Sequence, residues 1–130
     1  MSSHPFLNAP RDPSRLRWLF AALSLAALLA GLEGWAVADH LYWRYVWSDT
    51  VMHFLGGMMS GSLAVGLLRT FRPLRFILVV AVIAFGWEAY EIAIGTPHAL
   101  NYAFDTSLDL LMDALGALLI YAIARRTIWR

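Results

Sequence analysis

The stretch DTSLDLLMDALGALL, residues 105–119, places three aspartates four residues apart at the start of an apolar segment. On a helix, residues four apart lie on one face, so Asp105, Asp109 and Asp113 form a descending row. The residues that follow have the composition of a membrane span. Carboxylates are rare and costly inside a bilayer, where they pair with other polar groups or serve a function. The stretch therefore predicts a polar site inside a membrane-embedded helix.

The composition supports a membrane protein. The chain has 130 residues, of which 60% are hydrophobic, whereas about half is typical of soluble domains. A chain this short cannot bury so much apolar surface in one aqueous core. The chain has no cysteine, which excludes disulfides and thiolate ligands. It also lacks a basic stripe or reading motif, so we expect no nucleic-acid partner.

Four apolar segments predict an all-α polytopic membrane protein, a four-helix bundle with short loops. We expect the spans at about residues 16–38, 50–68, 74–94 and 106–124, since a spanning helix needs about 20 apolar residues. Residues 1–14, which contain three prolines, are expected to form a flexible cytoplasmic tail. The remaining residues, 15–130, are expected to form a single membrane domain.

The first apolar segment also fits a second interpretation. A basic region, an apolar core and the small residues Ala36 and Ala38 before Asp39 resemble a cleavable signal peptide. The apolar run is long for such a peptide and contains Glu33. We therefore expect the segment to be retained as a span, with cleavage as the alternative.

The arginines predict the orientation. Nine of the ten lie in the N-terminal tail, the 69–75 turn or the C-terminal tail, and Arg44 alone lies elsewhere. The positive-inside rule then places both termini and this turn in the cytoplasm, and we expect the bacterial inner membrane. Tyr42, Trp43, Tyr45 and Trp47 are typical of an aromatic belt at the outer interface.

Polar residues from three spans are expected to meet in the outer half of the bilayer. Eight of the nine acidic residues fall in the outer loops or in the outer half of a span, and His53 lies one turn below Asp49. Crowded carboxylates need protons or a metal ion to balance their charge in a low dielectric. The expected cofactor is a divalent metal (Zn, Mn, Fe or Mg), and protons without any cofactor are the alternative. The candidate ligands are Asp49, His53, Glu88, Glu91, Asp109 and Asp113.

Some of these acidic residues also have a purely structural interpretation. Asp105 is expected to cap the N-terminus of the last helix, where aspartate is favoured. Glu88 and Glu91 are the candidate general bases, but hydrogen bonds to neighbouring tyrosines or serines would make them packing residues. The glycines and serines of residues 56–66 predict close helix–helix packing.

Three motifs carry a resemblance to known families. They are the Asp49-x3-His53 pair with the two glycines that follow it, the Glu88-x2-Glu91 pair, and the aspartate series of residues 105–113 with Gly116. The series resembles the small YjdF-like (DUF2238) bacterial membrane proteins and, more loosely, the VanZ-like family. The resemblance covers about residues 49–120. It implies a polytopic helical membrane protein with a polar cluster, and no established reaction. VanZ-like proteins have glutamine and asparagine where this chain has Glu91 and Asp113.

Three functions are compatible with these patterns. In the first, the polar site acts on a lipid or a lipid-linked substrate at the outer leaflet. In the second, the carboxylates handle protons or cations without catalysis. In the third, the chain is a structural or accessory subunit that docks on a second copy or on a partner membrane protein. Membrane lipids are partners in all three, and whether the chain is an enzyme stays open.

Overall fold

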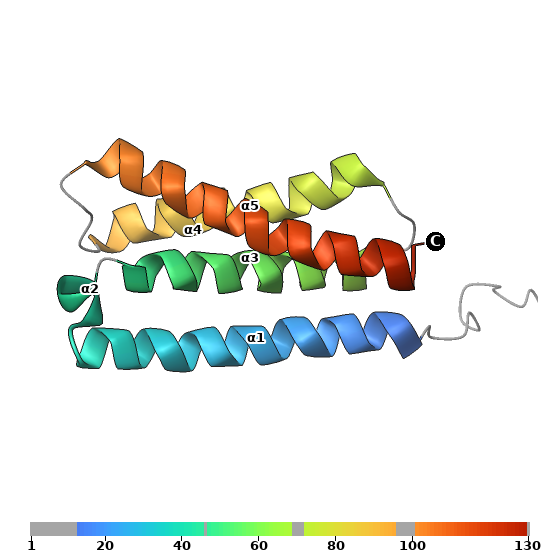
Figure 1. Cartoon of the computed structure of the whole chain (residues 1–130), viewed down its shortest axis with the longest axis horizontal. Coiled ribbons are helices and arrows are strands. Elements are labelled where there is room, and N and C mark those ends of the chain that lie inside the picture. The colour runs from blue at the N-terminus through green and yellow to red at the C-terminus, as the bar shows by residue number, and fades with distance from the viewer. Residues whose placement is uncertain (1–12, 46, 69–71, 96–100, 130) are drawn as a thin grey trace, which may run out of the picture.

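The computed structural model describes residues 13–45, 47–68, 72–95 and 101–129, and these residues form helices with no strand among them. The helices are α1 (Pro13–Ala38), α2 (Leu41–Arg44), α3 (Trp47–Leu67), α4 (Pro73–Ile94) and α5 (Tyr102–Thr127) (Figure 1). The predicted all-α fold with four long helices is confirmed. The short helix α2, between the first two long ones, was not expected.

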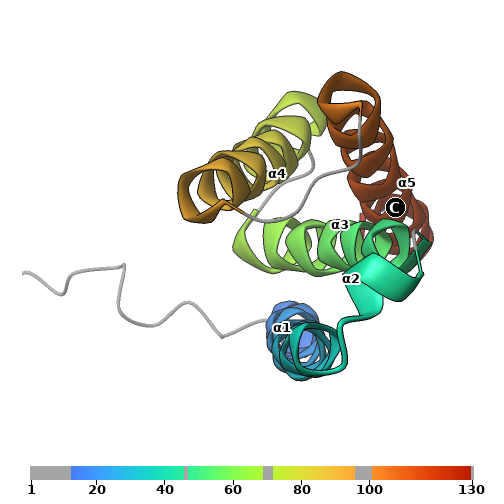
Figure 2. The same cartoon turned by 90° about the vertical axis from the view of Figure 1, so that its left-hand side faces the viewer.

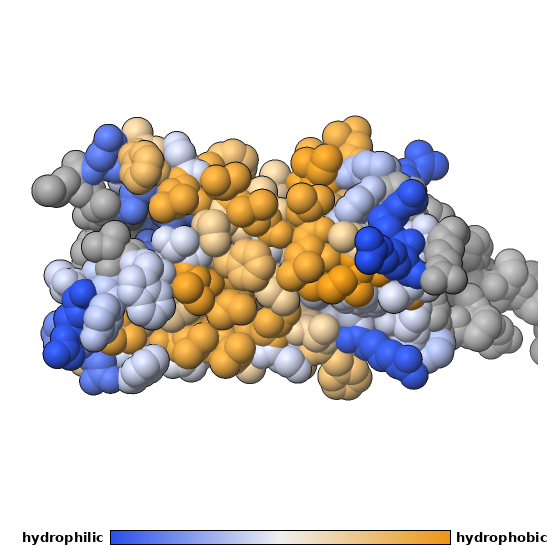
Figure 3. All heavy atoms as spheres, viewed as in Figure 1, coloured by the Kyte–Doolittle hydropathy of each residue, from blue (hydrophilic) through white to orange (hydrophobic). Residues whose placement is uncertain are grey.

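Four helices, α1, α3, α4 and α5, are long and apolar enough to cross a membrane. With 21 to 26 residues each, they reach about 30–40 Å at 1.5 Å per residue. Large apolar side chains cover the outside of the bundle, among them Phe20, Leu23 and Val82, each at least 66% exposed. They form a hydrophobic band between two polar ends (Figure 3). The chain is a multi-pass membrane protein.

The helix ends follow local sequence signals, with small shifts from the expected bounds. Pro73 opens α4 in the first turn, and Gly95 closes it in the left-handed conformation with φ 71°. α5 begins at Tyr102, four residues before the expected start, because Asn101 caps it. α1 takes in Pro13 and Ser14 from the expected tail. The rest of that tail, residues 1–12, lies outside the described residues.

Helix α3 is the centre of the bundle. It packs against α1 on one side and against α4 and α5 on the other, while α1 contacts neither α4 nor α5 within the described helices (Figure 2). The small residues of α3 explain this position, because glycine, serine and alanine let several neighbours approach its backbone at once. α3 accordingly buries a larger share of its length than any other described helix.

Two glycines bring α3 and α5 into backbone contact. A Cβ added to Gly57 would lie 2.0 Å from the carbonyl oxygen of Asp113, and one added to Gly116 would lie 2.1 Å from the carbonyl oxygen of Phe54. The predicted close packing of the glycine-rich helix is confirmed. The contact fixes the register between the two helices.

The two ends of the bundle differ in chemistry. The start of α1, the end of α3, the start of α4 and the end of α5 lie at one end (Figure 1). There the guanidinium of Arg15 donates hydrogen bonds to the carbonyl oxygens of Gly66, at 2.8 Å, and Leu67, at 2.9 Å. These bonds satisfy carbonyls that the end of α3 leaves open. Within the described residues, the start of α1, the end of α5 and residues 72–75 thus share one end of the bundle.

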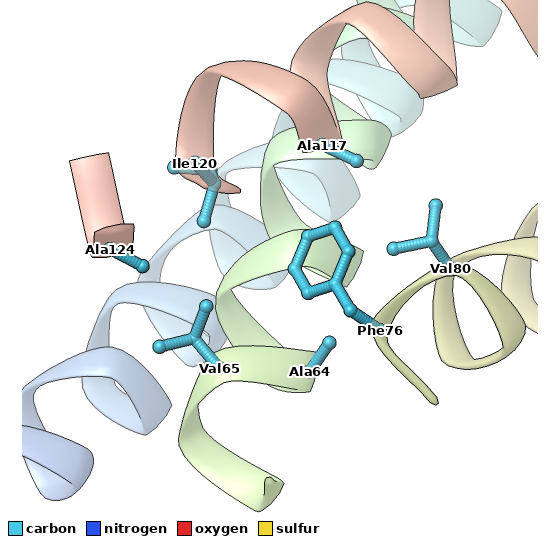
Figure 4. Packing of buried hydrophobic residues seen from close by; sticks show 7 residues of the cluster. All are labelled: Ala64, Val65, Phe76, Val80, Ala117, Ile120 and Ala124. Carbon is cyan, nitrogen blue, oxygen red and sulfur yellow. The ribbon is translucent and has the colours of Figure 1, made fainter. Parts of the chain in front are cut away.

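An apolar cluster fills the half of the bundle nearer that end. Side chains from α3, α4 and α5 converge in it (Figure 4). Its buried members are Ala64, Val65, Phe76, Val80, Ala117, Ile120 and Ala124. His53 and the acidic residues grouped around it lie in the opposite half.

Candidate metal centre

His53 of α3 lies at the centre of a polar cluster and is 4% exposed. Its Nδ1 lies 3.2 Å from Oδ2 of Asp113 on α5. Its other ring nitrogen, Nε2, lies 3.7 Å from Oδ1 of Asp49 and 3.8 Å from Oδ2 of Asp109. Nδ1 thus contacts the carboxylate of Asp113, while Nε2 faces two further carboxylates.

Two buried polar atoms in this cluster lack a hydrogen-bond partner. They are Nε2 of His53 and Oε1 of Glu88, which comes from α4 and is 5% exposed. Leaving a buried donor or acceptor unpaired costs about 1–3 kcal/mol. These two buried atoms are therefore available to bind a ligand.

Histidine and carboxylate side chains converge there in three overlapping groups. Within each group the candidate ligand atoms lie within 4.8 Å of one another. A metal ion with bonds of about 2.0–2.6 Å separates its ligand atoms by no more than roughly twice that length. The groups are His53–Glu88–Asp109, Asp49–His53–Glu91 and Asp49–Asp105–Asp109. The first consists of buried residues alone and takes one ligand from each of α3, α4 and α5.

The six predicted ligands lie close together in the structure. Five of them belong to the three groups, and the sixth, Asp113, lies on the other side of the imidazole. Asp113 belongs to none of the three groups, because it contacts the Nδ1 side of His53. A ligating histidine almost always has its second nitrogen bonded to a carboxylate or carbonyl, which orients the ring. Asp113 has the geometry of that orienting residue.

The expectation that Asp105 caps the last helix is wrong. The N-cap is Asn101, whose side-chain oxygen accepts a hydrogen bond from the backbone N–H of Phe104 at 3.2 Å. Asp105 lies one turn further on, in a group with Asp49 and Asp109. The four-residue spacing from Asp109 already placed it on the same face, and the asparagine four positions earlier was the signal for the cap.

Tyr42 is a site residue that the sequence reasoning missed, because it was assigned to the aromatic belt. Its hydroxyl donates a hydrogen bond to Glu33 of α1. Burial raises the pKa of Tyr42, and the hydrogen bond and negative charge of Glu33 raise it further. The pair ties α2 to α1 at the edge of the polar cluster. The expectation that Glu33 reaches the cluster's level is thus supported.

A cavity of about 480 Å³ adjoins the cluster. Its polar lining comprises Glu33, Tyr42, Asp49, His53, Ser60, Trp87, Glu91 and Asp113. The indole N–H of Trp87 donates to Oε1 of Glu91 at 2.9 Å, so this carboxylate is held at the cavity wall. Glu88 is not part of the lining. The two candidate bases therefore occupy different places, one beside the cavity and one behind it.

No family model, no curated protein and no solved structure matches this chain. The polar cluster is therefore defined by its own geometry: one imidazole held from behind by Asp113, with carboxylates of three helices in front of it.

Proposed function

We propose that the chain binds one divalent metal ion through Nε2 of His53 and the carboxylates of Glu88 and Asp109, and that the ion serves a reaction on a lipid or lipid-linked substrate. One observation carries the proposal. The imidazole of His53 is fixed through Nδ1 by Asp113, while its buried Nε2 faces carboxylates without a hydrogen-bond partner. This is the arrangement in which histidine binds metals.

The charge balance of the cluster also favours a metal. The cluster contains a single imidazole and six carboxylates, which are those of Asp49, Glu88, Glu91, Asp105, Asp109 and Asp113. Burying charges without compensation costs several kcal/mol per ion in proteins. A divalent cation supplies two positive charges at this position. Because one ligand is an imidazole, Zn²⁺, Mn²⁺ and Fe²⁺ fit better than Mg²⁺, which prefers oxygen ligands.

The site divides into binding and reacting groups. A bound divalent ion polarises a carbonyl or phosphoryl oxygen. Glu91 borders the cavity and is held by Trp87, so we assign it the role of general base. Glu88 lies behind the cavity wall among buried residues, so we assign it to the metal. The two glutamates are thus given separate roles.

The same residues support an orientation in the membrane and a family. Since arginines gather at the end of the bundle opposite the cluster, we place that end in the cytoplasm of a bacterium and the metal site in the outer half of its inner membrane. The motifs that supply the cluster are those that resemble YjdF-like proteins, and on them we propose membership of that family.

The structure supports a transport pathway for protons or cations less well than it supports a metal site. Such a path needs polar groups from one end of the bundle to the other. Beyond Asp113, the buried polar side chains of the described residues are Ser60 and Ser62, followed by the apolar cluster of Figure 4. The polar site is therefore closed on its inner side.

Metal analysis of the purified protein tests the proposal. After incubation with Zn²⁺, Mn²⁺ or Fe²⁺ and removal of free ions, we expect one ion per chain in the wild type. His53→Ala, Glu88→Gln and Asp109→Asn should each lose it. Asp39→Asn is the matched control, because Asp39 is an exposed acid outside the groups. Wild-type protein without stoichiometric metal, or full loading of His53→Ala, would refute the proposal.

Thermal unfolding provides a second readout that does not depend on the variants folding equally well. A ligand at 100 times its Kd stabilises the folded state by about 2.7 kcal/mol. The wild type should therefore melt at a higher temperature with the metal than with a chelator. An unchanged melting temperature at saturating metal would count against a site in the folded chain.

A further inference from the structure

We propose that the cavity beside the metal centre holds one hydrocarbon chain of a membrane phospholipid, which enters sideways between α1 and α4. The lipid's phosphate group then lies at the metal centre. This inference rests on the proposed function and names the substrate class of the same site.

The opening follows from the packing of the helices. The cavity is lined by residues of α1, α3 and α4, yet α1 does not contact α4 (Figure 2). Ala30 of α1 and Trp87 of α4 line the cavity, and both are exposed. The cavity therefore opens laterally toward the bilayer rather than only toward water.

The polarity of the cavity lining changes along the helices. Toward the middle of the bundle it is apolar, with Ala26 and Leu29 of α1, Met59 of α3 and Ile83 of α4. Toward the end with α2 it carries Glu33, Tyr42, Asp49 and Glu91. A lipid has the same polarity along its length. The apolar part suits a chain, and the polar part suits a head group.

The depth of the cavity matches one leaflet. Glu91 and Ile83 lie eight residues apart on α4, which is about 12 Å at 1.5 Å per residue. Asp49 and Ser60 lie eleven residues apart on α3, which is about 16.5 Å on the same rise. Half of a bilayer core is about 15 Å. A chain of the adjoining leaflet thus fits without crossing the midplane.

The volume favours a chain over a protein helix. A hydrocarbon chain is narrower than an α-helix, which is about 10–12 Å wide with its side chains, and the cavity has a volume of about 480 Å³. Water is a poor occupant of its apolar part, because apolar cavities stay dry. A bound divalent ion of any of the proposed kinds polarises a phosphoryl oxygen. A phospholipid satisfies both ends of the cavity.

Lipid retention by a cavity-filling variant tests this inference. Wild-type protein reconstituted in vesicles of phosphatidylglycerol is extracted in mild detergent, and bound lipids are counted by native mass spectrometry. Ala30→Trp places a large side chain in the cavity. Ala27→Trp is the matched control, because Ala27 is exposed on the same helix and does not line the cavity. Metal content is measured on the same samples.

We expect the wild type and Ala27→Trp to retain one phosphatidylglycerol per chain. Ala30→Trp should retain at least tenfold less of this lipid. The metal content should be equal in all three proteins. Equal retention by Ala30→Trp and the wild type would overturn the inference while leaving the metal centre intact. Wild-type protein that retains lipid but no metal would instead overturn the proposed function.

A crosslinking experiment on the wild type avoids any folding defect of the variants. Phosphatidylglycerol with a photoreactive diazirine in its chain is activated in the extracted complex, and the labelled residues are mapped by peptide mass spectrometry. Labels at Leu29, Met59 or Ile83 are expected. Labels confined to outward residues such as Leu23 and Val82 would refute the inference.

Discussion

Gly57 of α3 lies directly against the backbone of Asp113 in α5: a Cβ at Gly57 would be 2.0 Å from the carbonyl oxygen of Asp113. The same Asp113 holds His53 through its side chain. Helix packing and site geometry therefore depend on one contact. A change that separates α3 from α5 moves the imidazole away from its orienting carboxylate.

Replacing this glycine should damage both stability and the site. Overpacking typically costs about 1–3 kcal/mol, and Gly57→Ala should reach the upper end of that range or exceed it, because the obstructing atoms are backbone. Gly86→Ala is the matched control, since a Cβ there meets nothing within 4 Å. It should leave stability unchanged or raise it by up to about 1 kcal/mol through helix propensity. Thermal unfolding in detergent measures both. A Gly57→Ala protein as stable as Gly86→Ala would contradict the packing described here.

The carboxylate behind His53 should tune metal affinity without binding the ion. Removing such an orienting group typically lowers affinity about 10- to 100-fold. We expect Asp113→Asn, which retains an oxygen that accepts a hydrogen bond, to lie at the mild end and Asp113→Ala at the severe end. Metal titration followed by calorimetry gives both constants. Wild-type affinity in Asp113→Ala would remove this role from Asp113, and Asp39→Asn controls for the loss of an acidic charge.

Asp105 and Asn101 should have separable effects. Asn101→Ala removes the N-cap of α5 and should cost about 0.5–2 kcal/mol of stability, with metal content unchanged. Asp105→Asn removes a carboxylate that converges with Asp49 and Asp109, so it should weaken metal binding and leave the cap intact. The two variants are compared by thermal unfolding and metal analysis. The assignment fails if their effects are reversed.

The Tyr42–Glu33 pair should make stability fall at alkaline pH. Burial, followed by the hydrogen bond and charge of Glu33, raises the pKa of Tyr42 in the folded protein. Above about pH 10, the ordinary tyrosine value, the unfolded chain releases this proton while the folded protein keeps it. Stability from this group is therefore complete below that pH and decreases above it.

Melting temperatures measured across this pH range check the effect. Tyr42→Phe, which cannot ionise, should lose less stability above about pH 10 than the wild type does. Trp43→Phe changes an exposed neighbouring aromatic without removing an ionisable group, so it should follow the wild-type curve. Identical curves for Tyr42→Phe and the wild type would argue against a buried, proton-retaining Tyr42.

The parts of the fold that follow from local chemistry were predictable. The apolar run lengths gave four spans, and Pro73 and Gly95 marked the two ends of α4. α5 starts four residues before the expected position, because Asn101 and not an aspartate caps it. The short helix α2 was missed because four residues give too little periodicity to recognise.

The sequence by itself determined that carboxylates and an imidazole would share one half of a membrane bundle, because helical rise fixes the depth of Asp49, Glu88 and Asp109 along their own helices. The rise per residue does not tell how each helix is rotated about its own axis or which helices are neighbours. Tertiary packing decided those: close backbone contact at Gly57 and Gly116 set α5 against α3, which placed Asp113 behind the imidazole and the other acids before it. The lateral cavity likewise exists because α1 packs on α3 and does not touch α4.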